Sequence, residues 1–227
     1  YGFICDVYGC RSKGVDQPNN TFATYFCGVT KFFPARPQAT TATFIFFDRR
    51  VSDPKAQSLV GWGSNARGQQ NVPAGVSLVS HIDAGLDHTI ALLPDGSVVC
   101  WGWNALNQCD VPAGLGPVRS VAGGDWHTVA VLANGTVAAW GDNFNGQVDV
   151  PAGISTAMHA AAGTQFSGVV LTDGTVRLWG ANQFGQCTPI SGLARVVKLE
   201  LGAEHSLAMR SDSTLAAWGS NSFGQSA

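Results

Sequence analysis

Charged side chains are scarce in this chain. Asp, Glu, Lys and Arg together make up 12% of its 227 residues, and the formal net charge is −2. The densest basic run is Asp48-Arg49-Arg50, and two adjacent arginines do not make the basic surface that nucleic-acid binding requires. We therefore expect no nucleic-acid partner and assign these arginines to solvated surface.

The patterns of membrane proteins and of common enzymes are also missing. No apolar run approaches the length of a transmembrane helix, so we expect no membrane insertion. No two cysteines have the spacing of a zinc site, and no Gly-rich phosphate loop precedes a helix. Asp87 and His88 are sequence neighbours, and neighbours on a strand point to opposite faces, so they do not build a catalytic triad. We expect no catalytic residues, no metal, no cofactor and no enzymatic activity.

Six cysteines stand out in this composition. An even number, with three in the first 30 residues, predicts disulfides and secretion into an oxidising compartment. The pairing is not determined by the sequence, although Cys100 and Cys109 flank one loop and could close it. Asn19 and Asn134 begin glycosylation sequons, and Asn134 also suits a tight turn. The candidate disulfide cysteines are Cys5, Cys10, Cys27, Cys100, Cys109 and Cys187.

A 39-residue repeat occupies most of the chain. The dipeptide Trp-Gly recurs at a constant interval of 39 residues, and each Trp is followed by Asn after three residues and Gln after seven. "VPAG" follows three of these loops. Such a period indicates stacked supersecondary units. The tryptophans predicted to form the structural repeat core are Trp62, Trp101, Trp140, Trp179 and Trp218.

Each unit has the pattern of short β-strands. Apolar runs such as "HTVAVL" and "TVAAWG" are joined by "ANG", "PDG" or "TDG", which predicts tight hairpins. A third apolar run precedes the next unit, and no amphipathic helix pattern occurs in the repeats. One unit cannot bury its own faces, whereas radially stacked units form a β-propeller. We expect the Trp to end a strand and to pack against the neighbouring unit.

The sequence predicts an all-β protein with two regions. Residues 1–30 do not fit the repeat and form a Cys-containing N-terminal segment or cap. Residues 31–227 form a β-propeller, or an open propeller arc, of about five blades. Within it, residues 31–75 make a degenerate first blade, in which "TFIFF" at 43–47 is the first hairpin strand.

The pattern HTxAL…DGTVxxWGxNxxGQ…VPAG resembles the regulator-of-chromosome-condensation repeat family. It is most similar to the short, secreted, bacterial-type version, which includes a β-lactamase inhibitor protein. The resemblance covers residues 57 to 227 and implies a propeller, commonly seven-bladed, that binds proteins through loops on one face. The founding member is an exchange factor for a small GTPase and binds chromatin, but the basic character for that role is missing here. Five blades could close a small ring, the N-terminal segment could supply more sheet, or an open arc could be completed by another copy.

Positions that agree between repeats are structural by this interpretation. His88, His127 and His205 share one repeat position with Phe166, which predicts that this position needs a flat ring and not a base. Function is expected where the repeats differ. The candidate protein-contact residues on the loops are Trp103, Leu106, Trp126, Phe144, Phe184 and Phe223.

The function that we expect is a secreted, non-enzymatic interaction or structural module that binds proteins through its propeller loops and self-assembles outside the cell. Its partners are then a foreign protein or other copies of itself. Two alternatives stay open. One is an extracellular filament subunit completed by neighbouring copies, and the other is a lectin-like glycan binder.

Overall fold

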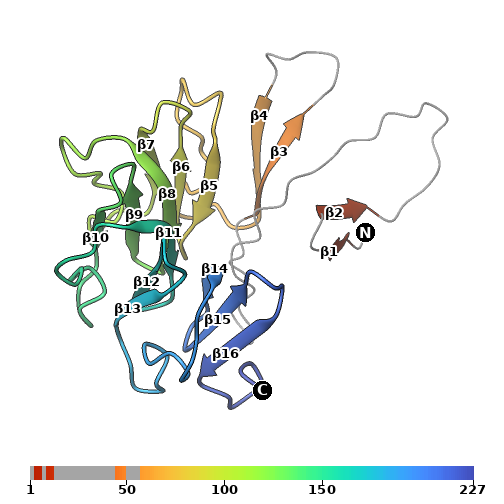
Figure 1. Cartoon of the computed structure of the whole chain (residues 1–227). Coiled ribbons are helices and arrows are strands. Elements are labelled where there is room, and N and C mark those ends of the chain that lie inside the picture. Colours follow the sequence, from red (N-terminus) through yellow and green to blue (C-terminus); the bar gives the residue numbers. More distant parts are fainter. Residues whose placement is uncertain (1–2, 7–8, 13–43, 50–56) are drawn as a thin grey trace.

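The computed structural model describes residues 3–6, 9–12, 44–49 and 57–227. The regular structure of these residues consists of antiparallel β-sheets, four with three strands and two with two strands (Figure 1). Within this part of the chain no helix is long and apolar enough to cross a membrane. The prediction of an all-β fold is confirmed.

Each three-stranded sheet forms one blade, with its strands in chain order. The blades are blade 1 with β5 (His81–Ala84), β6 (His88–Leu92) and β7 (Val98–Gly102); blade 2 with β8 (Val118–Gly123), β9 (His127–Leu132) and β10 (Val137–Gly141); blade 3 with β11 (Ala157–Ala162), β12 (Phe166–Leu171) and β13 (Val176–Gly180); and blade 4 with β14 (Val196–Leu201), β15 (His205–Arg210) and β16 (Leu215–Gly219). The two-stranded sheets pair β1 (Phe3–Asp6) with β2 (Gly9–Ser12) and β3 (Phe44–Arg49) with β4 (Gln57–Trp62).

The hairpin between the second and third strand of each blade is a tight turn made by its own side chains. In blade 2, the carboxamide oxygen of Asn134 accepts hydrogen bonds from the Thr136 N–H at 3.0 Å and from the Thr136 hydroxyl at 2.7 Å. An aspartate does the same in the other blades. In blade 1, the hydrogen bonds from the Ser97 hydroxyl and N–H lower the pKa of Asp95. Asn134, the residue of the second sequon, is therefore held by its own turn.

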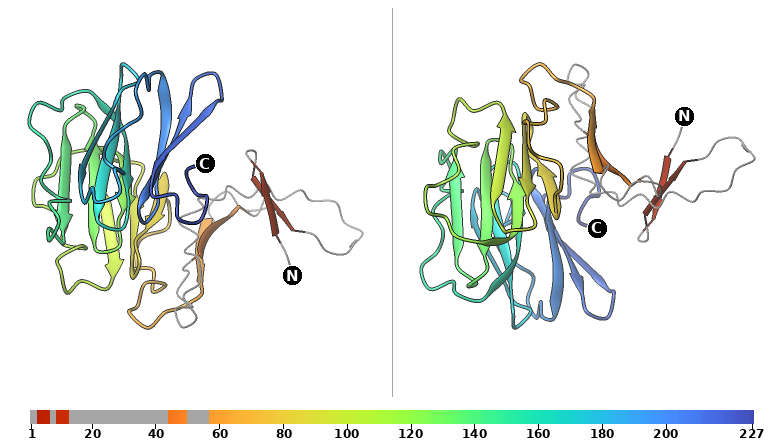
Figure 2. Two further views of the ribbon diagram at one scale, coloured as in Figure 1. Left: turned by 90° about the horizontal axis from the view of Figure 1, so that it is seen from below. Right: turned by 90° about the horizontal axis from the view of Figure 1, so that it is seen from above.

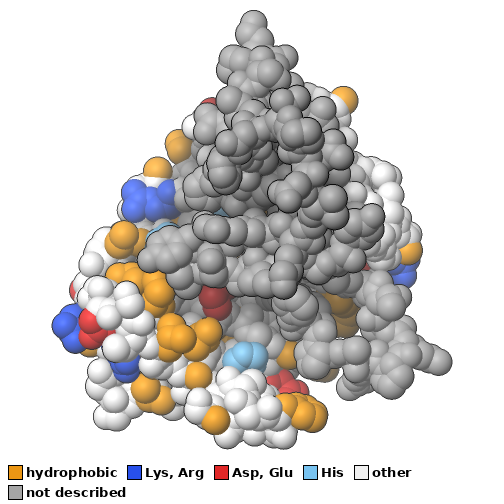
Figure 3. Space-filling view, turned by 90° about the vertical axis from the view of Figure 1, so that its right-hand side faces the viewer, with side chains coloured by type: hydrophobic (Ala, Val, Ile, Leu, Met, Phe, Trp, Pro, Cys, Tyr) orange, Lys and Arg blue, Asp and Glu red, His pale blue; other side chains and the backbone are white. Residues whose placement is uncertain are grey.

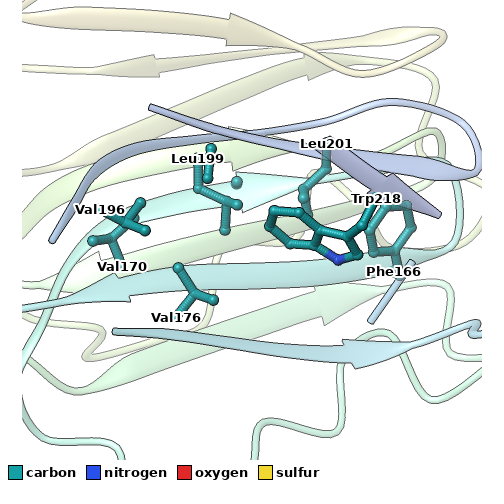
Figure 4. Close-up of a cluster of buried hydrophobic side chains, with 9 residues drawn as sticks. Phe166, Val170, Val176, Val196, Leu199, Leu201 and Trp218 are labelled. Carbon is teal, nitrogen blue, oxygen red and sulfur yellow. The ribbon is translucent and has the colours of Figure 1, made fainter. Parts of the chain in front are cut away.

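Hydrophobic cores lie between consecutive blades. Between blades 3 and 4, Phe166 and Val170 of β12 pack with Leu199 of β14 and Trp218 of β16 (Figure 4). Equivalent cores join blade 1 to blade 2 and blade 2 to blade 3, and each contains the strand-ending Trp of the later blade. Because one blade has two faces and no interior of its own, the fold depends on stacking of the units.

The blades stand side by side in an open propeller arc (Figures 1 and 2). The first strands of consecutive blades lie next to one another. Asp83 of β5 accepts a hydrogen bond from the Gly123 N–H of β8 at 2.9 Å, and Ser120 of β8 accepts one from the Ala160 N–H of β11 at 3.1 Å. Polar side chains thus join the first strands across the blade boundaries.

The expectation of about five blades corresponds to four three-stranded blades and the two-stranded β3–β4 sheet. Leu59 of β4 packs in a core with Ile82 and Trp101, so this sheet lies against blade 1. Most of residues 1–56, with Cys27 and Asn19, lies outside the described part of the chain, and so does most of the predicted cap. In the backbone register of β1 and β2, Cys5 is opposite Cys10.

Candidate protein-contact surface on the Trp-Gly loops

One end of the arc carries the loops that follow each Trp-Gly pair and the turns that precede each second strand. Backbone hydrogen bonds join them within each blade, as when the Trp103 N–H donates to the Asp87 carbonyl and the Asp142 N–H donates to the Trp126 carbonyl, both at 2.8 Å. We call this surface the Trp-Gly loop face. It comprises loops 63–71, 102–110, 141–149, 180–188 and 219–226 with turns 85–87, 124–126, 163–165 and 202–204.

The repeated Asn and Gln hold each loop in shape. In loop 141–149, the Asn143 side chain accepts a hydrogen bond from the Val148 N–H at 3.0 Å and donates one to Asp149 at 2.8 Å. The Gln147 side chain accepts one from the Asn145 N–H at 2.8 Å. Asn104, Asn182 and Asn221, with Gln108, Gln186 and Gln225, accept the same backbone bonds in the other loops. These side chains therefore fix the shape of each loop.

The backbone carbonyl of the same Gln connects one unit to the next. The Gln108 carbonyl accepts hydrogen bonds from the Thr128 hydroxyl at 2.9 Å and from the Trp140 indole N–H at 3.0 Å. The same pair of hydrogen bonds is accepted by the backbone carbonyls of Gln69, Gln147 and Gln186. The tryptophans of the four blades are buried, and each is fixed at both its ring and its N–H. Only the backbone of Trp62 is described.

Gly141 shows why Gly follows each Trp. Its φ is 108°, and a Cβ there would lie 2.6 Å from the Trp126 carbonyl oxygen and 2.8 Å from the His127 Cα. Any other residue would be strained and would separate the loop from the turn behind it.

The ring position next to these turns is a packing site. His88 and His127 are buried, and their Nε2 atoms lie 3.2 and 2.9 Å from hydroxyl oxygens of Thr128 and Ser167 in the following blades. Phe166 fills the same position in blade 3 without any polar atom. A Cβ on the Gly three residues earlier would clash with each ring, so the Gly makes the slot. In blade 4, burial lowers the pKa of His205.

The side-chain amide of the repeated Gln does not have the same partner in every loop. The Gln147 Nε2 donates to Asp142 at 2.8 Å, and the Gln69 Nε2 donates to Asp87 at 3.3 Å. At Gln108 both acceptor positions are occupied by tryptophan, because Trp103 replaces the Asp142 position and Trp126 replaces the Asp87 position. Gln108 is fully buried, and its Nε2 has no hydrogen-bond partner among the described residues.

The two tryptophans that replace these acceptors contact each other. Their ring centroids are 6.1 Å apart, with an edge-to-face angle of 69°. The Arg67 guanidinium lies 5.8 Å from the centroid of the Trp103 ring. Both rings are half-buried. Arg67, Trp103 and Trp126 therefore form one cluster, the Trp pair cluster, across three successive units.

The other candidate residues occupy equivalent loops further along the arc. Phe144, Phe184 and Phe223 are 87%, 50% and 90% exposed, and Leu106 is half-buried. No ring contact joins these three phenylalanines in residues 57–227, whereas Trp103 and Trp126 do touch. On the coloured part of the surface in Figure 3, acidic and basic side chains are scattered among hydrophobic and uncharged groups.

The sequence identified the two tryptophans separately and missed the contact between them, the position of Arg67 and the unpaired Gln108 amide. An alignment of the repeats shows tryptophan at positions 103 and 126, but only the hydrogen bonds of the other loops identify these as acceptor positions of the Gln amide. Among the described residues no three His, Cys, Asp or Glu side chains are grouped to hold a metal ion.

Residues 79–108, 118–147 and 196–225 each match the regulator of chromosome condensation (RCC1) repeat. The chain therefore carries RCC1-type repeats in these three segments. The predicted family resemblance is confirmed, and the repeat that contains Phe166 lies between the matched segments. No curated protein matches the chain.

Solved structures of RCC1-type and related propellers share this fold. The ectodomain of the Physcomitrella patens receptor kinase CR4 has a TM-score of 0.64 at 21% identity, over 81% of this chain and 51% of that one. The CRINKLY WD40 ectodomain of the Arabidopsis thaliana receptor kinase ACR4 has 0.63 at 21%, over 78% and 68%. Prp20p from Saccharomyces cerevisiae has 0.64 at 18%, over 79% and 56%. This chain thus spans about half to two thirds of the length of these three proteins.

Proposed function

We propose that this protein is a non-enzymatic module that binds a protein partner on the Trp-Gly loop face, centred on the Trp pair cluster. The observation that carries the proposal is the unpaired amide of Gln108. A buried polar group without a partner costs about 1–3 kcal/mol. Departures from a repeat's own bonding rule that reduce stability are expected at functional positions.

The chemistry of the cluster suits a protein contact. Trp and Arg are the residue types most enriched among those that dominate binding energy. The three exposed phenylalanines extend the apolar surface around the arc, and exposed apolar groups on loops indicate interaction sites. Related propellers support the same style of function, since yeast Prp20 binds Gsp1p and histones and has been solved in complex with Kap60.

Charge narrows the kind of partner. Residues 57–227 contain six basic and eleven acidic side chains, and the loop face carries Asp110, Asp142, Asp149 and Glu204. We expect a partner with an apolar centre and a basic rim, whose association slows as salt screens the attraction.

The test is cross-linking capture from the native source with the full chain and two variants. Trp103→Asp restores at the Trp pair cluster the acceptor that Asp142 supplies in the next loop. Leu78→Ser removes an exposed leucine outside the loop face and is the matched control. We expect Trp103→Asp to reduce recovery of a specific protein at least tenfold and Leu78→Ser to leave it unchanged. Equal recovery with all three proteins would contradict the proposal.

A second candidate, self-association, is favoured by one sheet face of blade 4. Leu215 is 61% exposed, whereas the equivalent Val176 of blade 3 is 8% exposed because blade 4 covers it. Leu207 and Met209 on β15 are only half-buried. We propose that a second copy of the chain covers this face outside the cell, either in a closed assembly or in a filament. Light scattering of Leu215→Asp beside the unmodified chain tests it, since a monomeric unmodified chain at high concentration would refute it.

A further inference from the structure

Two cysteines meet at the base of the loop that carries Trp103. Cys100 lies on β7, and its Sγ is 3.6 Å from the Gln108 carbonyl oxygen, one peptide unit from Cys109. The Cys109 Sγ is 3.7 Å from the Trp103 carbonyl oxygen, so it also faces the inside of the loop. Burial raises the pKa of Cys100, and a hydrogen bond with the Cys109 side chain adds to that rise.

The preceding unit gives an independent measure of the spacing. Gly61 and Gln70 occupy the repeat positions of Cys100 and Cys109. A Cβ placed on Gly61 would lie 3.2 Å from the Gln70 Cβ and 3.5 Å from its Cα. Disulfides have Cβ–Cβ distances of roughly 3.5–4.5 Å, so the repeat holds these positions within a few tenths of an ångström of disulfide spacing.

The third cysteine of the blades provides an internal contrast. Cys187 occupies the same repeat position as Cys109, and its Sγ is 3.2 Å from the Ala181 carbonyl. Gln70 and Ser226 donate to the equivalent carbonyls at 2.9 and 3.1 Å, so a donor here is an ordinary part of the loop. Cys100 has no such ordinary role, because its position is occupied in the other units by Gly61, Ala139, Leu178 and Ala217.

We propose that Cys100 and Cys109 form a disulfide that ties strand β7 to loop 102–110, while Cys187 stays a thiol. A small-molecule disulfide such as oxidised glutathione is the oxidant. One cysteine thiolate attacks a glutathione sulfur and displaces a glutathione thiolate. The other cysteine then attacks the mixed disulfide and displaces the second. Two electrons pass from the cysteine pair to glutathione, and the two cysteine protons end on two reduced glutathione molecules.

The bond fixes the Trp103 loop and persists once made. It closes a short loop whose ends are already held by Asn104 and Gln108, so it removes freedom from the unfolded chain without reshaping the fold. Closing requires a thiolate, so the raised pKa of Cys100 slows closing in the folded protein. When an external thiolate attacks the bond, a thiol of high pKa is a poor leaving group, which slows release of Cys100. The bond therefore forms during folding in an oxidising compartment, and it does not depend on what the loop face binds.

The test is peptide mapping of the full chain refolded with reduced and oxidised glutathione, after free thiols are blocked by alkylation. We expect a peptide that links Cys100 to Cys109 and alkylated Cys187. Alkylation of both Cys100 and Cys109 would overturn the proposal and leave Cys109 as a thiol hydrogen-bond donor only. A link from either cysteine to Cys187 or to the N-terminal cysteines would overturn it as well.

Thermal unfolding adds a measurement that allows for the other cysteines. Reductant should lower the Tm of the oxidised chain by roughly 5 °C through this bond. The same reductant should lower the Tm of Cys100→Ala by correspondingly less, because Ala139 and Ala217 show that alanine fits this position. Cys187→Ser should respond like the unmodified chain. An equal shift in all three proteins would contradict the proposed bond.

Discussion

Loops 102–110 and 141–149 are built on the same frame and differ at the point where function is proposed. In both loops an Asn side chain and a Gln side chain each accept a hydrogen bond from a backbone N–H of the loop. In both, the Gln backbone carbonyl accepts hydrogen bonds from the next blade. In loop 141–149 the remaining Gln amide is satisfied by Asp142, whereas in loop 102–110 Trp103 occupies that position and the amide has no partner among the described residues. The frame tolerates the loss because its other bonds are unchanged.

The largest expected effect comes from breaking what the two loops share. Trp140→Ala removes a buried ring and the indole donor to Gln108, and should lower the free energy of unfolding by about 3–5 kcal/mol. Trp179→Ala should cost a similar amount through Gln147, which chemical denaturation can measure for both. A cost below about 1 kcal/mol for either variant would mean that the shared frame does not hold the blades together.

The second-largest effect is expected when loop 141–149 is made to resemble loop 102–110. Asp142→Ala deprives the Gln147 amide of its acceptor, and a buried donor left unpaired costs about 1–3 kcal/mol. Urea denaturation should show this loss with an unchanged m-value. Asp149→Ala, which removes an exposed acceptor of Asn143, is the control and should cost less.

The reverse exchange, which makes loop 102–110 resemble loop 141–149, should leave the free energy of unfolding nearly unchanged. Trp103→Asp supplies an acceptor to Gln108, which is worth about 1–3 kcal/mol, and loses an aromatic pair and a cation–π contact worth roughly 1–2.5 kcal/mol together. We expect a change in unfolding free energy within about 1 kcal/mol, measured by denaturation beside Trp103→Ala, which regains no bond and should be less stable. If both variants were equally destabilised, the Gln108 amide would not be the difference between the loops.

The smallest effect is expected at the repeat position that His205 shares with Phe166. Burial depresses the pKa of His205, so protonation favours the unfolded chain, and stability present above the ordinary histidine pKa is lost as pH falls through the lower folded value. His205→Phe copies Phe166 of blade 3 and should flatten this part of the stability curve between pH 7.5 and 5, as thermal melts across that range can show. A curve of unchanged slope would assign the loss to other groups.

The repeat period predicted the parts of the fold that every unit shares. Val-rich runs, Asn-Gly and Asp-Gly turns and the Trp-Gly interval sufficed for the strands, the hairpins and the stacking of units, because those features depend on local chemistry. The choice between a closed ring and an open arc stayed undecided by the sequence. The contact between Trp103 and Trp126 could not be read in the same way, since it depends on how far one unit turns relative to the next. The Gln108 amide was missed because its partners are defined only by hydrogen bonds seen in the other loops.

The hydrogen bonds to each repeated Gln carbonyl affect how the blades fold during synthesis. These bonds reach 20 and 32 residues forward, and the ring position reaches 40, so the side-chain links between blades lie within about one unit of sequence. A blade can therefore dock as soon as the following 39 residues have emerged from the ribosome, without waiting for a distant segment. Growth of the arc by gene duplication needs nothing more, because an added unit brings both its own acceptor and the donors for the unit before it.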